Sequence, residues 1–195
     1  MKGYTVVLLF LLVEWSYQVT DNNEATVLKF SYLDGKWEVP HKIVLDATRK
    51  RLFWTEVTQK KISSCDYDGS NMEDVLQLFS TPVGLMLDTE TDELYFSTIW
   101  DQFYPGRVSK VDLRDGDLQD LFALPSLYYP TTLAADKSQN LIFWATGSVS
   151  EDGLPKIQRA EIDGKHGRNL VTDAKDPKAI VLDSFSQRLT LRWFF

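Results

Sequence analysis

"KIVLDATRKRLFWTE" (42–56) joins an apolar run that ends in an acid, five mostly polar residues, and a second run built on aromatics. The chain repeats this pattern in "GLMLDTETDELYFST" (84–98) and "TLAADKSQNLIFWAT" (132–146), and echoes it in "AIVLDSFSQRLTLRW" (179–193). A period of about 40–50 residues indicates that each repeat is one supersecondary unit, which buries its apolar faces against its neighbours. The acids that end the first runs lie 42, 48 and 47 residues apart, and they are Asp46, Asp88, Asp136 and Asp183.

Other positions of the repeat recur at fixed distances from this acid. A proline stands six residues before it, an aliphatic residue stands six residues after it, and an aromatic follows two residues later in three of the four repeats. The chain has seven prolines, so four of them at one position indicate a common register rather than chance. The prolines are Pro40, Pro82, Pro130 and Pro177, and the aromatics are Trp54, Phe96 and Trp144, with Leu191 in the fourth repeat.

Each complete repeat continues with an element that closes on Asp-Gly: "ISSCDYDG" (62–69), "VSKVDLRDG" (108–116) and "IQRAEIDG" (157–164). Asp-Gly indicates a hairpin turn because both residues tolerate positive φ. A last apolar stretch follows at 74–79, 118–124 and 168–173. No segment carries a sustained 3.6-residue stripe, so helices are not expected. Four short strands per repeat predict an all-β fold, the β-propeller, in which each repeat is one blade.

The single cysteine, Cys65, excludes a disulfide within the chain and a thiolate metal cluster. It aligns with Val111 and Ala160 of the following repeats, so we interpret it as a small buried residue. Paired aromatics in the second strands are expected to fill the wedge between neighbouring blades. These pairs are Phe53/Trp54, Tyr95/Phe96 and Phe143/Trp144.

The combination of proline, aspartate, an aromatic-Trp-Thr-acid element and a closing Asp-Gly resembles the low-density lipoprotein receptor class B repeat, also called the YWTD repeat. Its nearest copy is "LFWTE" (52–56), and "LYFST" (94–98) and "IFWAT" (142–146) are looser. The resemblance implies a six-bladed β-propeller, of which about four blades are present as a fragment or an incomplete ring. A ring completed by a second copy is an alternative. The predicted repeats are 40–81, 82–129, 130–176 and a partial 177–195, within a propeller region 40–195.

The acid that closes the signature is Glu56 in the first repeat, but Thr98 and Thr146 replace it in the next two. The resemblance implies that this acid supports hydrogen bonding between blades. Such bonding is therefore expected only where Glu56 stands.

Residues 1–39 allow two interpretations. Lys2 followed by the apolar run 5–13 has the form of a secretory signal peptide, and the run is too short to span a membrane. Alternatively, residues 12–35 align without gaps to 141–164. That alignment makes residues 1–20 the inner strands of a degenerate leading blade and 21–39 its outer part. The sequence leaves both interpretations open.

The net charge of −7, with acids and bases interspersed, argues against nucleic acid or an anionic membrane as the main partner, because both require a basic footprint. The two histidines, His41 and His166, belong to no catalytic motif, and the sequence has no phosphate-binding glycine loop or zinc spacing. We therefore expect a protein that is not an enzyme and that uses no cofactor.

The repeated aspartates support one alternative, because carboxylates that point into a central channel could bind a cation. Calcium-dependent six-bladed hydrolases share this general architecture. An acid at one position of every blade is better explained by the need to satisfy backbone donors, so no metal site is predicted. A degenerate intracellular scaffold is a further alternative, since Cys65 is free and no Asn-x-Ser/Thr sequon is present.

The links between the predicted strands differ in length in a regular way. The first-to-second link is constant and the third-to-fourth link is an Asp-Gly turn, whereas the other two links vary and emerge on one face. Insertions on one face of a repeat protein often mark its binding face, and aromatics with acids are typical of protein-binding hot spots. Local packing under the loops is the alternative. The candidate ligand-binding residues are Trp100, Asp101, Phe103, Tyr104, Tyr128, Tyr129, Glu151 and Asp152.

The resemblance implies a protein-binding module of the extracellular type. Such propellers bind secreted proteins in endocytic uptake, Wnt co-receptor signalling or matrix assembly, and they neighbour cysteine-rich EGF-like modules. The expected location is therefore extracellular, either secreted or in the ectodomain of a single-pass membrane receptor. The expected partner is a secreted or extracellular protein ligand.

Overall fold

The computed structural model describes the backbone of residues 5–11, 14–21, 24–30, 40–99, 105–124, 128–148, 154–174, 179–183 and 188–192. Side chains are described for residues 40–99, 105–124, 130–147, 154–174 and 180. Nearly all regular structure in this part of the chain is β-strand, and the one exception is a short 3-10 helix, Lys137–Gln139.

Three antiparallel sheets of four strands follow one another along the chain, and each is a meander of consecutive strands. The first blade contains β4 (Pro40–Asp46), β5 (Arg51–Glu56), β6 (Lys61–Asp66) and β7 (Glu73–Gln77). The second blade contains β8 (Pro82–Asp88), β9 (Glu93–Thr98), β10 (Arg107–Asp112) and β11 (Leu118–Ala123). The third blade contains β12 (Tyr128–Asp136), β13 (Leu141–Ser148), β14 (Lys156–Glu161) and β15 (Arg168–Val171).

Two smaller sheets complete the described structure. An amino-terminal sheet has the order β1 (Thr5–Leu11), β2 (Glu14–Asp21) and β3 (Glu24–Phe30). A carboxy-terminal hairpin pairs β16 (Ala179–Asp183) with β17 (Arg188–Arg192). Part of region 1–39 thus forms three strands. Whether the region is a signal peptide or a degenerate leading blade stays a prediction. Residues 31–39 lie outside the described residues.

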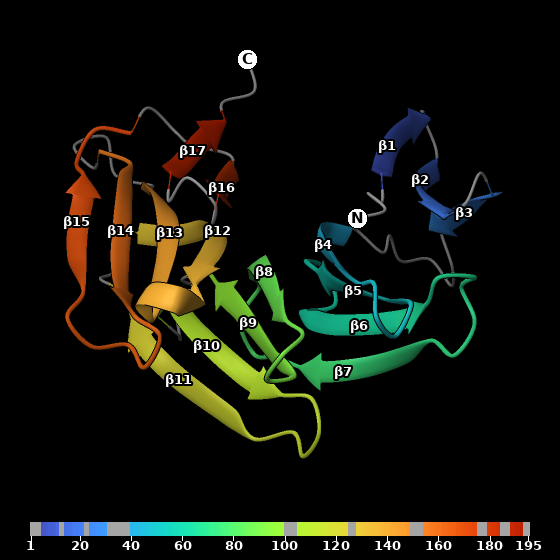
Figure 1. The fold of residues 1–195 in the computed structure, drawn as a ribbon, viewed down its shortest axis with the longest axis horizontal. Coiled ribbons are helices and arrows are strands. Elements are labelled where there is room, and N and C mark those ends of the chain that lie inside the picture. The colour runs from blue at the N-terminus through green and yellow to red at the C-terminus, as the bar shows by residue number, and fades with distance from the viewer. Residues whose placement is uncertain are drawn as a thin grey trace.

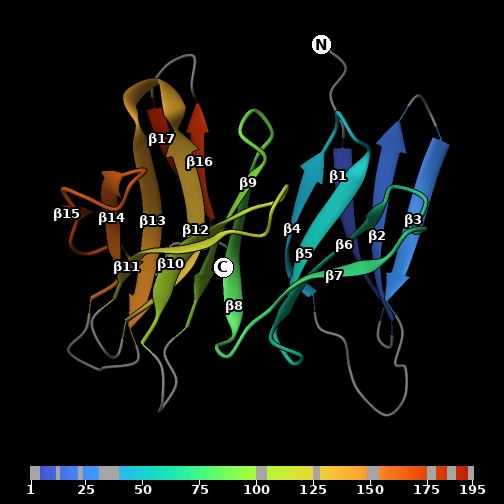
Figure 2. The same cartoon turned by 90° about the horizontal axis from the view of Figure 1, so that it is seen from below.

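The sheets are arranged around a common centre (Figure 1). The first strand of each blade, β4, β8 or β12, lies nearest the centre, together with β16, and the fourth strands lie at the periphery. Figure 2 shows the second blade on one side of the first blade and the amino-terminal sheet on the other. This radial order of antiparallel meanders is that of a β-propeller, so the predicted fold class is confirmed.

Each third-to-fourth link turns at the glycine of the predicted Asp-Gly pair. Gly69, Gly116 and Gly164 have φ of 83°, 76° and 86°, a region that residues with a Cβ adopt only at a cost. The aspartate of each pair is not among the residues with positive φ, and its carboxylate stabilises the turn instead. For example, Asp68 Oδ1 accepts a hydrogen bond of 2.9 Å from the amide of Ser70.

The core lies in the seams between blades, because each sheet buries both of its faces. The predicted aromatics are buried there: Phe53 and Phe96 pack together between the first and second blades, and Tyr95 and Trp144 between the second and third. The face of the first blade that points away from the second carries Trp54 and is also buried. The prediction that second-strand aromatics fill the wedges is therefore confirmed.

Candidate functional site

The repeated aspartates end the first strands and organise the turns that follow. Asp46 Oδ1 accepts hydrogen bonds of 3.0 Å from the amides of Thr48 and Arg49. Asp88 Oδ1 accepts bonds of 2.9 and 3.3 Å from the amides of Glu90 and Thr91. Asp136 repeats the arrangement, with a bond of 3.2 Å from the amide of Gln139. The interpretation that these acids satisfy backbone donors is confirmed for these three blades; the side chain of Asp183 lies outside the described residues.

Each of these turns ends in the left-handed region, four residues after its aspartate. Lys50, Asp92 and Asn140 have φ of 56°, 60° and 57°. This shared backbone conformation explains why the first-to-second link keeps one length in the sequence. It also fixes the orientation of the charged side chains that the turns carry.

The turn geometry favours the ionised form of Asp46 and Asp88. Burial of Asp46 disfavours its charge, but hydrogen bonds from the Arg49 amide and guanidinium outweigh burial and lower the pKa of Asp46. Burial likewise opposes ionisation of Asp88, and bonds from Lys137 and from the Glu90 and Thr91 amides lower its pKa. In the described part of the chain, no group of three or more His, Cys, Asp or Glu residues is placed to hold a metal ion.

Glu56 accepts two hydrogen bonds from residues of its own blade. Its Oε1 accepts bonds of 3.0 Å from Trp54 Nε1 and 2.6 Å from Ser63 Oγ, and the carboxylate is almost fully buried. Lys61, on the paired strand, places its ammonium 3.7 Å from Oε2. Both hydrogen bonds lie within one sheet, because Trp54 precedes Glu56 by two residues on β5 and Ser63 on β6 faces Trp54. The hydrogen bonding between blades that the family resemblance implied stays a prediction.

In the third blade, a different residue accepts the hydrogen bond of the tryptophan indole. Gln158 Oε1 accepts bonds of 3.1 Å from Trp144 Nε1 and 2.7 Å from Thr146 Oγ1. Gln158 faces Trp144 across the strand pair, as Ser63 faces Trp54. In the first blade the acceptor for the tryptophan, Glu56, lies on the second strand, whereas in the third blade the acceptor, Gln158, lies on the third strand. Thr146, which occupies the position of Glu56, donates a hydrogen bond instead of accepting one.

Cys65 lies where its alignment predicts. It is buried and pairs with Leu52, just as Val111 pairs with Leu94 and Ala160 with Ile142. Burial raises the pKa of the Cys65 thiol to about 11, so the thiol is protonated at neutral pH. The interpretation as a small buried residue is confirmed.

Both histidines lie apart from any catalytic arrangement in the described residues. His41 Nδ1 lies 2.9 Å from the carbonyl oxygen of Val83, which links the first strands of two blades. Burial lowers the pKa of His41, although the bond to Val83 opposes this effect. His166 lies at an exposed turn, 2.8 Å from Glu161.

Most of the predicted ligand-binding residues lie outside the described part of the structure. This holds for Trp100, Asp101, Phe103, Tyr104, Glu151 and Asp152, whereas Tyr128 and Tyr129 are described only as backbone at the start of β12. We call the face that carries the second-to-third and fourth-to-first links the variable-link face. The opposite, short-link face carries the first-to-second and third-to-fourth links.

Two exposed apolar residues of the variable-link face escaped sequence analysis. The side chain of Phe79 is 78% exposed and that of Leu154 is 52% exposed. The expected fourth strand 74–79 included Phe79, but β7 ends at Gln77, so Phe79 belongs to the link. Two hydrogen bonds hold this link against the turn at Lys60. Lys60 Nζ donates one of 2.9 Å to the carbonyl oxygen of Phe79, and the Leu78 amide donates one of 2.8 Å to the carbonyl oxygen of Lys60.

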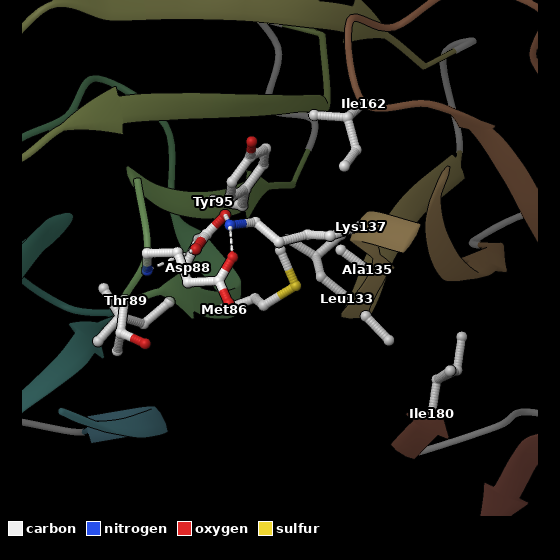
Figure 3. Close-up of a pocket in the computed structure, with 12 residues that line it drawn as sticks. Met86, Asp88, Thr89, Tyr95, Leu133, Ala135, Lys137, Ile162 and Ile180 are labelled. Carbon is white, nitrogen blue, oxygen red and sulfur yellow. Dashed lines mark hydrogen bonds and ion pairs between the residues drawn. The ribbon is translucent and has the colours of Figure 1, made fainter. Parts of the chain in front are cut away.

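Two hollows open on the short-link face, where no binding residue was predicted. One, of about 410 Å³, lies between the first and second blades and is lined by Arg49, Arg51 and Arg114 and by Glu73, Asp74 and Asp92. The other, of about 450 Å³, lies between the second and third blades (Figure 3). Their side chains come from segments about one repeat apart, so local sequence patterns gave no signal for them.

Comparison with known proteins identifies the fold. No family model matches the chain. A chain in the crystal structure of a nidogen–laminin complex superposes with a TM-score of 0.74 at 18% identity, over 97% of this chain and 70% of that one. TolB from Acinetobacter baumannii gives a TM-score of 0.63 at 10% identity, over 91% of this chain and 42% of TolB. At these identities the likeness shows a shared β-propeller fold.

A third similar structure is regucalcin from Agrobacterium tumefaciens, described as a calcium-binding protein. It gives a TM-score of 0.56 at 13% identity, over 74% of this chain and 46% of that chain. The chain thus spans less than half of TolB and of regucalcin. Among its described residues, no helix has the length and apolar character needed to cross a membrane.

Proposed function

We propose that this chain is a non-enzymatic, protein-binding propeller of an extracellular or receptor protein, and that its ligand is a secreted protein. The observation that carries the proposal is the superposition of 97% of the chain on a propeller taken from a complex of two proteins, nidogen and laminin. The resemblance to the YWTD repeat supports the same class of function. Endocytic uptake, Wnt co-receptor signalling and matrix assembly are the roles within that class.

We place the ligand on the variable-link face. Phe79 and Leu154 lie exposed on two of its links, in different blades. The sequence adds Trp100, Tyr104, Tyr128 and other aromatics to the same set of links. Exposed aromatic anchors surrounded by a few charges are the usual source of binding energy in protein interfaces.

A panel of purified secreted and ectodomain proteins tests the proposal by biolayer interferometry. The variants are Phe79→Ser and the pair Trp100→Ala/Tyr104→Ala, and the control is Arg114→Ala on the short-link face. We expect one panel member to bind the wild type with a Kd below about 10 μM, and the face variants to weaken that complex at least tenfold. Binding that only Arg114→Ala weakens, or no binding across the panel, would contradict the proposal.

Calcium removal separates this proposal from a calcium-dependent hydrolase. The carboxylates of Asp46, Asp88 and Asp136 already accept hydrogen bonds from their own turns. We therefore expect chelation by EDTA to change the Tm by less than about 1 °C, since a bound ion stabilises only the state that holds it. A fall of several degrees, reversed by added calcium, would favour the hydrolase.

A further inference from the structure

The hollow between the second and third blades has the size of a small-molecule site. Its volume is about 450 Å³, within the range of about 300–1,000 Å³ that is usual for ligand pockets. We call it the seam pocket. It opens on the short-link face, where β8, β12 and β16 contribute lining residues beside the centre of the propeller.

The walls of the seam pocket are mainly apolar. Met86, Leu133, Ala135, Ile162 and Ile180 line it from four different segments of the chain. In Figure 3, Tyr95 and Ile162 lie on one side of Lys137 and Ile180 lies on the other. A cavity with such walls gains free energy when an apolar body displaces its water.

The charges at the seam pocket are unbalanced. Lys137 Nζ lies 2.5 Å from Asp88 Oδ2 and 3.1 Å from Glu90 Oε2. Lys137 is the only cation among the lining residues, and Asp88 and Glu90 are the only anions. One ammonium shared by two carboxylates leaves one net negative charge. The Glu90 side chain is 83% exposed, so its carboxylate can accept a second cation.

The hollow between the first and second blades lacks this combination. Three arginines and three acids line it, so its formal charges cancel, and only three apolar residues contribute: Phe53, Val75 and Leu113. The seam pocket is thus the described hollow that joins apolar walls to a net charge.

We propose that the seam pocket binds a small amphipathic cation, a primary ammonium attached to an apolar body of about ten non-hydrogen atoms. The ammonium pairs with Glu90 at the mouth, and the apolar body covers Met86 and Ile162. Charge complementarity selects the cation, because an anion in the same place would face two carboxylates at close range. The site lies on the face opposite the proposed protein ligand, so the inference does not depend on the proposed function.

Methionine methyl NMR reports on this pocket directly. The chain has three methionines, of which Met86 lines the pocket and Met72 is exposed on the first blade, away from it. The probes share one body and differ in charge: 3-phenylpropylamine, 3-phenylpropanol and 3-phenylpropionate. With [¹³C-methyl]methionine we expect the amine to shift the Met86 signal saturably and to leave Met72 unchanged. The alcohol should bind at least fivefold more weakly, and the acid should not bind.

Two variants test which residues carry the binding. Glu90→Gln should weaken the amine about three- to tenfold, whereas Glu73→Gln, an exposed acid at the other hollow, should leave its Kd unchanged. Ala135→Phe should fill the pocket and abolish binding. Because Glu90 is exposed, Glu90→Gln gives a result even if Ala135→Phe fails to fold. A Met86 signal that stays fixed up to 5 mM amine, equal affinity for the three probes, or equal Kd values for the two glutamine variants would overturn the proposal.

Discussion

Lys50, Asp92 and Asn140 occupy one left-handed position in three equivalent turns, but they do so at different energetic cost. Asparagine and aspartate adopt this region readily because their short polar side chains bond locally, whereas lysine pays the full steric penalty. The first blade therefore keeps a strained residue where the third blade has a relaxed one. Within this turn the strain lies at Lys50, since the aspartate at the start of each turn bonds in the same way.

Exchange of these two residues tests the strain. Lys50→Asn should raise the free energy of unfolding by about 0.5–1 kcal/mol, because asparagine tolerates the left-handed backbone. The reverse change, Asn140→Lys, should lower it by a similar amount. Urea unfolding of both variants measures the difference. A loss of stability in Lys50→Asn would show that backbone strain does not decide this position.

Because of Cys65, the free energy of unfolding depends on pH in the alkaline range. Its pKa is raised from 9.0 to about 11 by burial, so the folded state retains the thiol proton more strongly than the unfolded state. The resulting stabilisation is complete below pH 9 and is lost as the pH rises toward 11. Tyr95, whose pKa burial also raises, adds to the loss at higher pH.

The variant Cys65→Ala isolates this contribution. Alanine occupies the equivalent position in the third blade, at Ala160, and cannot ionise. Between pH 8.5 and 10.5 we expect the free energy of unfolding to fall less steeply with pH in Cys65→Ala than in the wild type. Equal slopes would mean that the thiol does not ionise on unfolding in this range.

At the scale of the strand and the turn, much of the structure follows from the sequence because the signals are local. An aspartate after an apolar run and an Asp-Gly pair each determine a turn within five residues, so the strands between them could be predicted. The end of the fourth strand could not: Leu78 and Phe79 continue the apolar pattern of "DVLQLF", but β7 has already ended at Gln77. When no turn residue separates a strand from the link that follows, the sequence pattern does not show whether an apolar residue belongs to the strand or to the link.

The hydrogen bonds of Gln158 test how one blade holds its tryptophan. Gln158→Leu leaves Trp144 Nε1 and Thr146 Oγ1 without their acceptor, and both of those residues are buried. We expect a loss of about 1–3 kcal/mol in the free energy of unfolding. Gln158→Glu, which keeps an acceptor oxygen, should lose clearly less. If the two variants are equally unstable, packing rather than hydrogen bonding accounts for the effect.

At the scale of the whole molecule, burial decreases from the middle of each blade to its rim. The second strands β5, β9 and β13 are almost entirely buried, whereas the described residues of the fourth strands β7, β11 and β15 are mostly exposed. The seam pocket also belongs to this scale. Lys137 and Asp88 meet across two blades, and their contact depends on the angle between sheets, which no local motif records.

Hydrogen exchange measures this radial order. Amides of β9 and β13 should exchange most slowly, at rates set by global unfolding, because both faces of these strands are packed between blades. Amides of β11 and β15 should exchange faster through local opening of the rim. Mass spectrometry of peptic peptides distinguishes the two classes. Uniform exchange across all four strands would indicate that each blade opens as one unit.

The acceptor for the blade tryptophan has changed strands while the bond itself has stayed in place. In the first blade, Glu56 accepts hydrogen bonds from Trp54 and Ser63. In the third blade, Gln158 accepts the corresponding bonds from Trp144 and Thr146. An alignment of the two blades therefore shows two mismatched positions, Glu56/Thr146 and Ser63/Gln158, although the hydrogen bond to the tryptophan is retained. Compensated exchanges of this kind lower the sequence similarity between two blades, while Trp54 and Trp144 each keep a hydrogen-bond acceptor.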